Sequence, residues 1–290
     1  MKINIIFICL LAFSIAKAQD ASQPLLTALT QLTEADYAWI GAKIYQNEAA
    51  SNPKYLTHWG KGEDFPSFGI AHFIWFPNIS TLQGGTKKSP PPYQETFPAM
   101  FAFVSKKSPP PIWLQQLWKQ SLQSSNQAFD APWQTKVQFD AVQSSNNMQS
   151  LRQWLLNTQT HQARFIVKGF QQRWADETAS LSTKRLERLN QRLNNMMAFK
   201  KGLFSVVDYF NFKGLGNNLK EQYQGQSWGL ISILEGMPHV VFEEDDHKML
   251  MAFIASAKKQ LQQRTELAPK ERNESRWLKG WFKRLDGYAK

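Results

Sequence analysis

Residues 34–77 read EADYAWIGAKIYQNEAASNPKYLTHWGKGEDFPSFGIAHFIWFP and contain a helical pattern followed by a pattern typical of short strands. The apolar residues of the first part recur at the spacing of one helix face, namely Tyr37, Ile40 and Ile44. Glu48 continues that face. Pro53 ends the pattern, because the residue before a proline avoids the helical region. The first part therefore predicts a helix over 34–48 that carries a carboxylate in its last turn.

The second part, from Lys54 to Pro77, is rich in turn residues. These are Gly60, Gly62, Pro66 and Gly69. The run from Phe68 to Phe76 has the aromatic and branched composition of a strand. This part predicts a small hairpin-like β lobe after the helix.

The remainder of the chain favours helices. Apolar residues recur at helix spacing near 133–143, 148–158, 160–175, 181–200, 203–211, 226–236, 246–264 and 275–286. The hexapeptide Lys-Lys-Ser-Pro-Pro-Pro occurs at 87–92 and 106–111, and we interpret both copies as surface connectors. No linker rich in Gly or Ser divides the sequence. We predict one mainly α (α+β) domain over 19–290.

The N-terminus has the parts of a secretory signal peptide. Lys2 is followed by an apolar run from Ile5 to Ala16 and by the small-x-small pattern Ala16-Lys17-Ala18. We expect cleavage after Ala18, which makes 1–18 the signal, and a periplasmic or secreted protein. The single cysteine, Cys9, lies in the signal, so the mature chain has no disulfide and no thiol ligand.

The formal net charge of +11 favours an anionic partner, such as a cell-wall polymer. No nucleic-acid-binding module is recognisable, so nucleic acid is not expected. The basic, aromatic run at 276–285 allows peripheral contact with a membrane surface, but we favour a final helix that packs Trp277, Trp281 and Leu285 inward. We expect a monomer.

Glu48 is the first candidate for catalysis. Its position on the apolar face predicts a side chain directed toward the core or a cleft wall. It also lies at the negative end of the helix dipole, where a second negative charge is disfavoured. A carboxyl group that keeps its proton near neutral pH suits the general acid of glycoside cleavage.

Polar side chains follow in the predicted hairpin. Glu63, Asp64, Ser67 and His72 are separated by glycines and a proline. If the hairpin folds back over the helix end, Asp64 or Glu63 could face Glu48 across a groove, and Ser67 could hold a water. Glycoside cleavage requires a pair of groups that flank the scissile bond.

These residues resemble the lysozyme-like superfamily, most nearly the phage-type lysozymes. The matching pieces are Lys43-Ile44-Tyr45-Gln46-Asn47-Glu48, then Asp64, Ser67 and Gly69-Ile70-Ala71-His72, with Ala71 at the position of a family glycine. The resemblance implies a lysozyme-like helical domain in which Glu48 is the acid, Asp64 and Ser67 place a water, and His72 braces the loop. It further implies binding or bracing roles for Glu63 and Tyr45.

The later segment Gly225-Gln226-Ser227-Trp228-Gly229-Leu230 resembles the Gly-Leu helix of soluble lytic transglycosylases. The resemblance implies that Gln226 and Trp228 contact the substrate or brace the site. The same segment matches the G-x-S-x-G pattern of a nucleophile elbow, but the preceding residues 219–224 are too polar for the strand that an elbow requires.

The acidic run 243–247 could bind a metal ion, but acidic residues before a helix more often cap its N-terminus. We therefore expect no metal site and no cofactor. The sequence predicts an exported enzyme that cleaves peptidoglycan glycan strands, as a lysozyme or a lytic transglycosylase does. The alternative is a non-catalytic cell-wall-binding or interaction protein with the same fold.

Overall fold

The computed structural model describes residues 29–78, 94–123, 128–217, 222–238 and 245–290. The predicted signal peptide and the first Lys-Lys-Ser-Pro-Pro-Pro copy lie outside the described residues.

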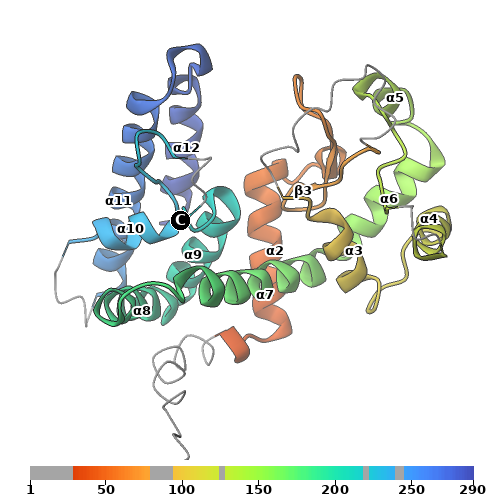
Figure 1. The fold of residues 1–290 in the computed structure, drawn as a ribbon. Helices are drawn as coiled ribbons and strands as arrows, with labels where there is room; N and C mark the ends of the chain where they lie inside the picture. Colours follow the sequence, from red (N-terminus) through yellow and green to blue (C-terminus); the bar gives the residue numbers. More distant parts are fainter. Residues whose placement is uncertain (1–28, 79–93, 124–127, 218–221, 239–244) are drawn as a thin grey trace, which may run out of the picture.

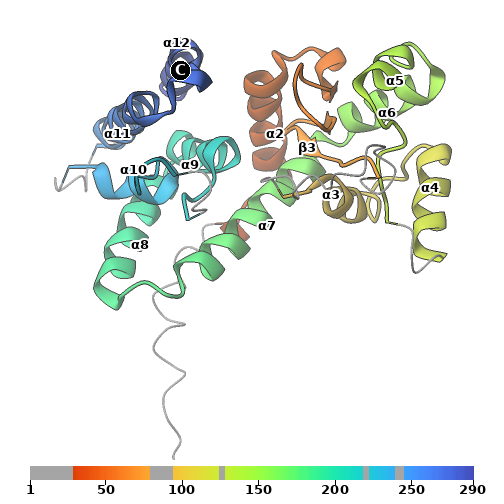
Figure 2. The same cartoon turned by 45° about the horizontal axis from the view of Figure 1, so that its top comes forward.

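The fold is mainly helical, with one small sheet (Figure 1). Two helices cross at its centre, α2 (Glu34–Ala49) and α7 (Gln159–Thr178). On one side lie η1 (Pro53–Leu56), β1 (Thr57–His58), β2 (Ser67–Phe68), β3 (Phe73–Ile74), α3 (Phe97–Val104), α4 (Ile112–Gln123), α5 (Lys136–Ala141) and α6 (Asn146–Asn157). On the other side lie α8 (Thr183–Met197), α9 (Lys200–Lys213), α10 (Leu230–Gly236), α11 (Asp246–Leu267), η4 (Lys270–Arg272) and α12 (Ser275–Gly287) (Figure 2).

Helix α2 has defined ends. Thr33 and Asp36 form a reciprocal capping box that satisfies backbone N–H groups at its start. Ala50 adopts the left-handed conformation at its C-cap, with φ of 49°. Its apolar face is buried as the sequence predicts, and Gly41 brings its backbone against Gln159 at the start of α7. The close crossing of α2 and α7 therefore depends on a residue without a side chain.

The β lobe is a three-stranded antiparallel sheet in the order β1-β2-β3. Thr57 pairs with Phe68, and Phe68 pairs with Phe73. The turn between β2 and β3 contains Gly69, with φ of 74°, and Gln162 of α7 accepts a hydrogen bond of 2.9 Å from the N–H of Ile70. A side chain at position 69 would collide with the same Gln162 amide, so this turn requires glycine.

One hydrophobic core runs through both groups of helices. Under the sheet it consists mainly of aromatic rings in edge-to-face and stacked contacts, namely Phe68, Trp75, Phe97, Phe129 and Trp133. On the other side, Tyr209, Phe253 and Tyr288 join α9, α11 and α12. No helix in the described ranges is long and apolar enough to span a membrane.

The prediction of a mainly helical protein with a small β element is confirmed. The sheet has three strands where a hairpin was expected, because the run 68–76 turns back on itself at Gly69 and His72, both with positive φ. The sequence assigned no helix to α3, whose residues are apolar on every side and so lack helical periodicity. In α12, Leu285 is buried as predicted, but Trp277 is 38% exposed, so its predicted burial is wrong.

Candidate functional site

Glu48 lies in the last turn of α2, as the sequence predicts. Its side chain is 18% exposed, and Oε1 accepts hydrogen bonds from the Arg284 guanidinium at 2.8 Å and from Nδ2 of Asn211 at 3.2 Å. These partners come from α12 and α9. The side chain is thus directed away from bulk water, as the sequence predicts, but its partners are polar groups of the C-terminal helices.

Arg284 is shared with a second carboxylate, Asp208 of α9. Its Nε and one terminal nitrogen donate to Asp208 at 2.7 and 2.8 Å. Asp208 is fully buried and also accepts from the Tyr288 hydroxyl at 2.6 Å and from Asn47 Nδ2 at 3.2 Å. Burial alone would lower the pKa of Arg284, but the charges of Asp208 and Glu48 outweigh it and raise that pKa well above its ordinary value. One guanidinium thus donates hydrogen bonds to both acidic side chains.

His72 lies near Glu48, in the turn before β3. Its backbone is left-handed, with φ of 51°, and its ring stacks on that of His58 with centroids 5.9 Å apart. Burial lowers the pKa of His72, while the Glu48 charge opposes that shift. Its buried Nε2 has no hydrogen-bond partner within the described structure. His72 is accordingly a neutral imidazole at neutral pH.

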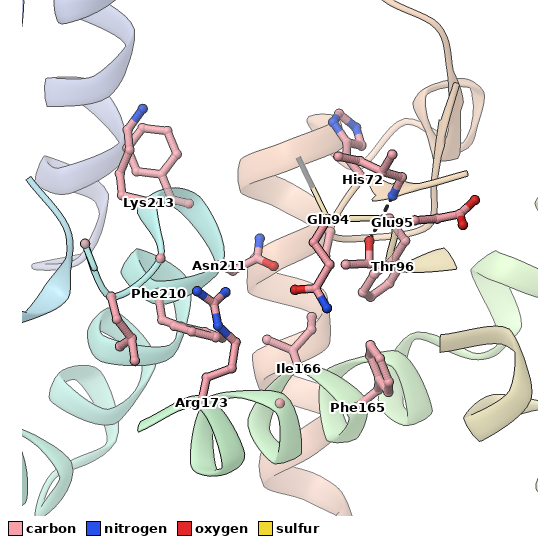
Figure 3. A pocket seen from close by; sticks show the side chains of 18 of the residues that line it. His72, Gln94, Glu95, Thr96, Phe165, Ile166, Arg173, Phe210, Asn211 and Lys213 are labelled. Atoms are coloured by element: carbon pink, nitrogen blue, oxygen red, sulfur yellow. Dashed lines mark hydrogen bonds between the residues drawn. The ribbon is translucent and has the colours of Figure 1, made fainter. Parts of the chain in front are cut away.

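A cleft of about 790 Å³ runs between the two groups of helices. One wall comes from β3, residues 94–96, α3 and α7, and the other from the end of α9, residues 214–216, Tyr223, Arg264 and Arg272. His72 and Asn211 line it from opposite sides (Figure 3). Glu48 is not itself among the described residues that line the cleft, but Asn211, which donates a hydrogen bond to it, is.

The other residues predicted for the hairpin lie apart from this lining. Asp64 and Glu63 are exposed, and Glu63 Oε2 accepts a 2.9 Å hydrogen bond from the N–H of Gly60, which closes the loop. Ser67 is 6% exposed and pairs with His58 in the sheet. None of these three is among the described residues that line the cleft.

The remaining predicted site residues, Tyr45, Gln226 and Trp228, make contacts that support the fold. Tyr45 is buried in the core on α2, and burial raises its pKa. Gln226 is exposed and pairs with Tyr223 in a turn. The Trp228 ring is buried below the Arg264 guanidinium, 4.6 Å from the ring centre, and its carbonyl accepts from Tyr209.

The nucleophile-elbow pattern around Ser227 and the acidic run before α11 also make contacts that support the fold. Ser227 donates a hydrogen bond of 2.8 Å to the carbonyl of Gly216, which holds two loops together before α10. Asp245 caps α11 by accepting from the N–H of Lys248 at 3.0 Å, as the capping interpretation predicts. The described residues contain no group of three or more His, Cys, Asp or Glu that could hold a metal ion.

Several residues at the cleft were missed by the sequence analysis. Asn211, Lys213 and Arg173 line it, and Asp208 and Arg284 form the ion pairs behind Glu48. One signal existed. Asp208 is the single acidic residue in the apolar stretch 203–210, and a carboxylate in such a stretch needs a buried partner.

Comparison of the chain with known protein families, curated proteins and solved structures gives no match.

Proposed function

We propose that this protein cleaves the glycan strands of peptidoglycan outside the cytoplasm, with Glu48 as the general acid and a lysozyme-like arrangement of helix and sheet. The observation that carries the proposal is an 18% exposed carboxylate at the end of a helix, next to a cleft of about 790 Å³. The +11 charge and the export pattern support a wall polymer as the substrate.

The lining of the cleft suits a chain of N-acetylated sugars. Amide and hydroxyl groups of Gln94, Thr96 and Asn211 can exchange hydrogen bonds with sugar hydroxyls and acetamides (Figure 3). Phe165 and Ile166 supply apolar surface for the faces of the rings. These groups are neutral, so they recognise the polymer backbone without regard to its charge.

In the proposed reaction, protonated Glu48 donates its proton to the glycosidic oxygen as the C–O bond breaks. Arg284 and Asn211 already point at the oxygen that becomes negative, and both stabilise the carboxylate left behind. Because Arg284 divides its charge between Glu48 and buried Asp208, it stabilises Glu48 less than an undivided ion pair would.

The test is Glu48→Gln, which keeps the shape of the side chain and removes the acidic proton. Release of soluble glycan fragments from purified peptidoglycan should fall about 10²- to 10⁴-fold, with unchanged circular dichroism. Glu34→Gln is the matched control, since Glu34 is exposed in the first turn of the same helix. Full activity of Glu48→Gln would rule out this site.

A wall-binding protein without catalysis is the second candidate. The observation that favours it is the Glu48–Arg284 ion pair, since a carboxylate held by a guanidinium is a poorer proton donor. Wild-type protein that sediments with peptidoglycan but releases no fragments between about pH 4 and pH 9 would establish it over the enzyme.

A further inference from the structure

One end of the cleft carries an excess of positive charge. Lys213, Arg264 and Arg272 line this end, and Glu274 is the carboxylate that the two arginines have in common. Arg264 donates to Glu274 at 2.6 and 3.1 Å, and Arg272 lies 3.0 Å from it. Two guanidinium groups thus share the one fully buried carboxylate of Glu274.

Lys213 has no carboxylate within ion-pair distance in the part of the chain that the structure describes. Its ammonium lies 4.0 Å from the centre of the Phe212 ring and 4.1 Å from that of Trp281. Arg173 comes from α7, but its guanidinium reaches across to α9, 5.2 Å from the centre of the Phe210 ring, with His72, Gln94 and Thr96 opposite (Figure 3). The basic side chains therefore lie together on one side of the cleft, while the opposite wall carries neutral polar groups and the carboxyl group of Glu95.

We propose that this end of the cleft, formed by Lys213, Arg264 and Arg272, binds a carboxylate of the ligand. The inference rests on the proposed function, since it assigns the substrate class of the same cleft: a wall glycan whose sugars carry acidic peptide or lactyl groups. A carboxylate here would supply the counter-ion that Lys213 lacks. Neutral polymers of N-acetylglucosamine would occupy the cleft without this contact.

The pKa of Lys213 provides a second measurement that tests this proposal. Burial lowers the pKa of Lys213 to about 7, with further lowering by Arg264 and Arg284 and opposition from Glu274 and Glu48. A bound carboxylate would raise that pKa again. Binding above about pH 7 should therefore take up a proton, and affinity should fall as pH rises, about tenfold for each unit by which the ligand raises the pKa.

The experiment uses calorimetry with the full mature chain and N-acetylmuramyl dipeptide, which has a free carboxyl and no glycosidic bond. The matched ligand is the same compound with that carboxyl amidated. We expect the free acid to bind at least about tenfold more tightly at pH 6 to 7, with uptake approaching one proton near pH 8 and little at pH 6. Buffers of different ionisation enthalpy measure that uptake.

Two variants separate charge from structure. Lys213→Met should abolish the preference for the free acid and the proton uptake. Lys213→Arg should keep the preference but lose the uptake, since an arginine stays charged throughout. Equal binding of the two ligands by wild type, or an unchanged preference in Lys213→Met, would overturn the proposal. Tight binding of inorganic phosphate with no binding of the dipeptide would assign the site to phosphate instead.

Because the probe cannot be cleaved, its binding is independent of turnover. Loss of the carboxylate preference with intact glycan cleavage would refute this inference alone. Full activity of Glu48→Gln together with normal probe binding would refute the proposed chemistry alone.

Discussion

Arg284 donates a hydrogen bond of 2.8 Å to Glu48, although the two residues are 236 positions apart in the chain. The same guanidinium binds Asp208, so α12 is joined to both α2 and α9. Helices α9 and α12 belong to the group on one side of the cleft, and α2 is one of the two central helices. The contact therefore fixes the position of the candidate acid relative to the C-terminal wall of the cleft.

We predict that Arg284→Met destabilises the protein by about 3–5 kcal/mol, because it leaves the buried charge of Asp208 without a counter-ion. Urea unfolding measures the change. The double variant Arg284→Met/Asp208→Asn should regain part of the loss, since it removes that charge as well. A double variant no more stable than the single one would show that Asp208 contributes nothing to the effect.

His72 gives a prediction on pH. Burial lowers its pKa in the folded protein, so below about pH 6.5 the unfolded chain binds more protons at this position. The contribution of neutral His72 to stability is present above that pH and is lost as pH falls through the folded pKa. His72→Asn keeps a residue that tolerates left-handed backbone but does not titrate.

The free energy of unfolding of His72→Asn should therefore fall less between pH 7.5 and pH 5.5 than that of wild type. Paired urea titrations at the two pH values measure this difference. His247→Asn is the control, because His247 is an exposed histidine in the first turn of α11, far from the β lobe in the sequence. Identical pH dependence of His72→Asn and wild type would contradict the assignment.

Two glycines of the β lobe offer a matched comparison. Both have positive φ, 85° at Gly62 and 74° at Gly69. A methyl group at Gly62 meets nothing within 4 Å, whereas one at Gly69 collides with the Gln162 amide that binds Ile70. Gly62→Ala should cost about 1 kcal/mol of backbone strain, and Gly69→Ala clearly more, about 2–3 kcal/mol. Equal losses in thermal unfolding would show that the Gln162 contact is readily rearranged.

The elements that local patterns define were predictable from the sequence. Helix α2 followed from the spacing of Tyr37, Ile40 and Ile44, and the cap of α11 followed from Asp245. The individual strands were less predictable, because each has only two residues and an alternation of apolar and polar residues cannot be recognised over that length.

The surroundings of Glu48 were not predictable for a different reason. Helix periodicity gives the face on which a residue lies, but its partners come from the tertiary fold. Arg284 lies in a basic, aromatic run for which the sequence favoured an inward-packed helix over a membrane-surface contact, but the run does not show which of its basic residues is buried. Only the burial of Asp208 in α9 makes an arginine at that place necessary.

The last prediction concerns the fate of the cleaved sugar. Hydrolysis requires a group that positions a water opposite the general acid, and Asp64 and Ser67 were the sequence candidates for it. Ser67 is 6% exposed within β2, and neither residue is among the described residues that line the cleft. We therefore expect the sugar's own hydroxyl to act as the nucleophile, so that the products carry anhydro ends.

Mass spectrometry of the products distinguishes the two outcomes, because an anhydro end is lighter than a reducing end by one water. Under the expected mechanism, Asp64→Asn and Ser67→Ala should each keep the wild-type rate within about threefold, far less than the factor of 10² or more that loss of a water-positioning group would cause. Glu48→Gln serves as the inactive reference. Reducing ends in the wild-type products, together with a large loss of rate in Ser67→Ala, would instead assign hydrolysis and return Ser67 to the reacting centre.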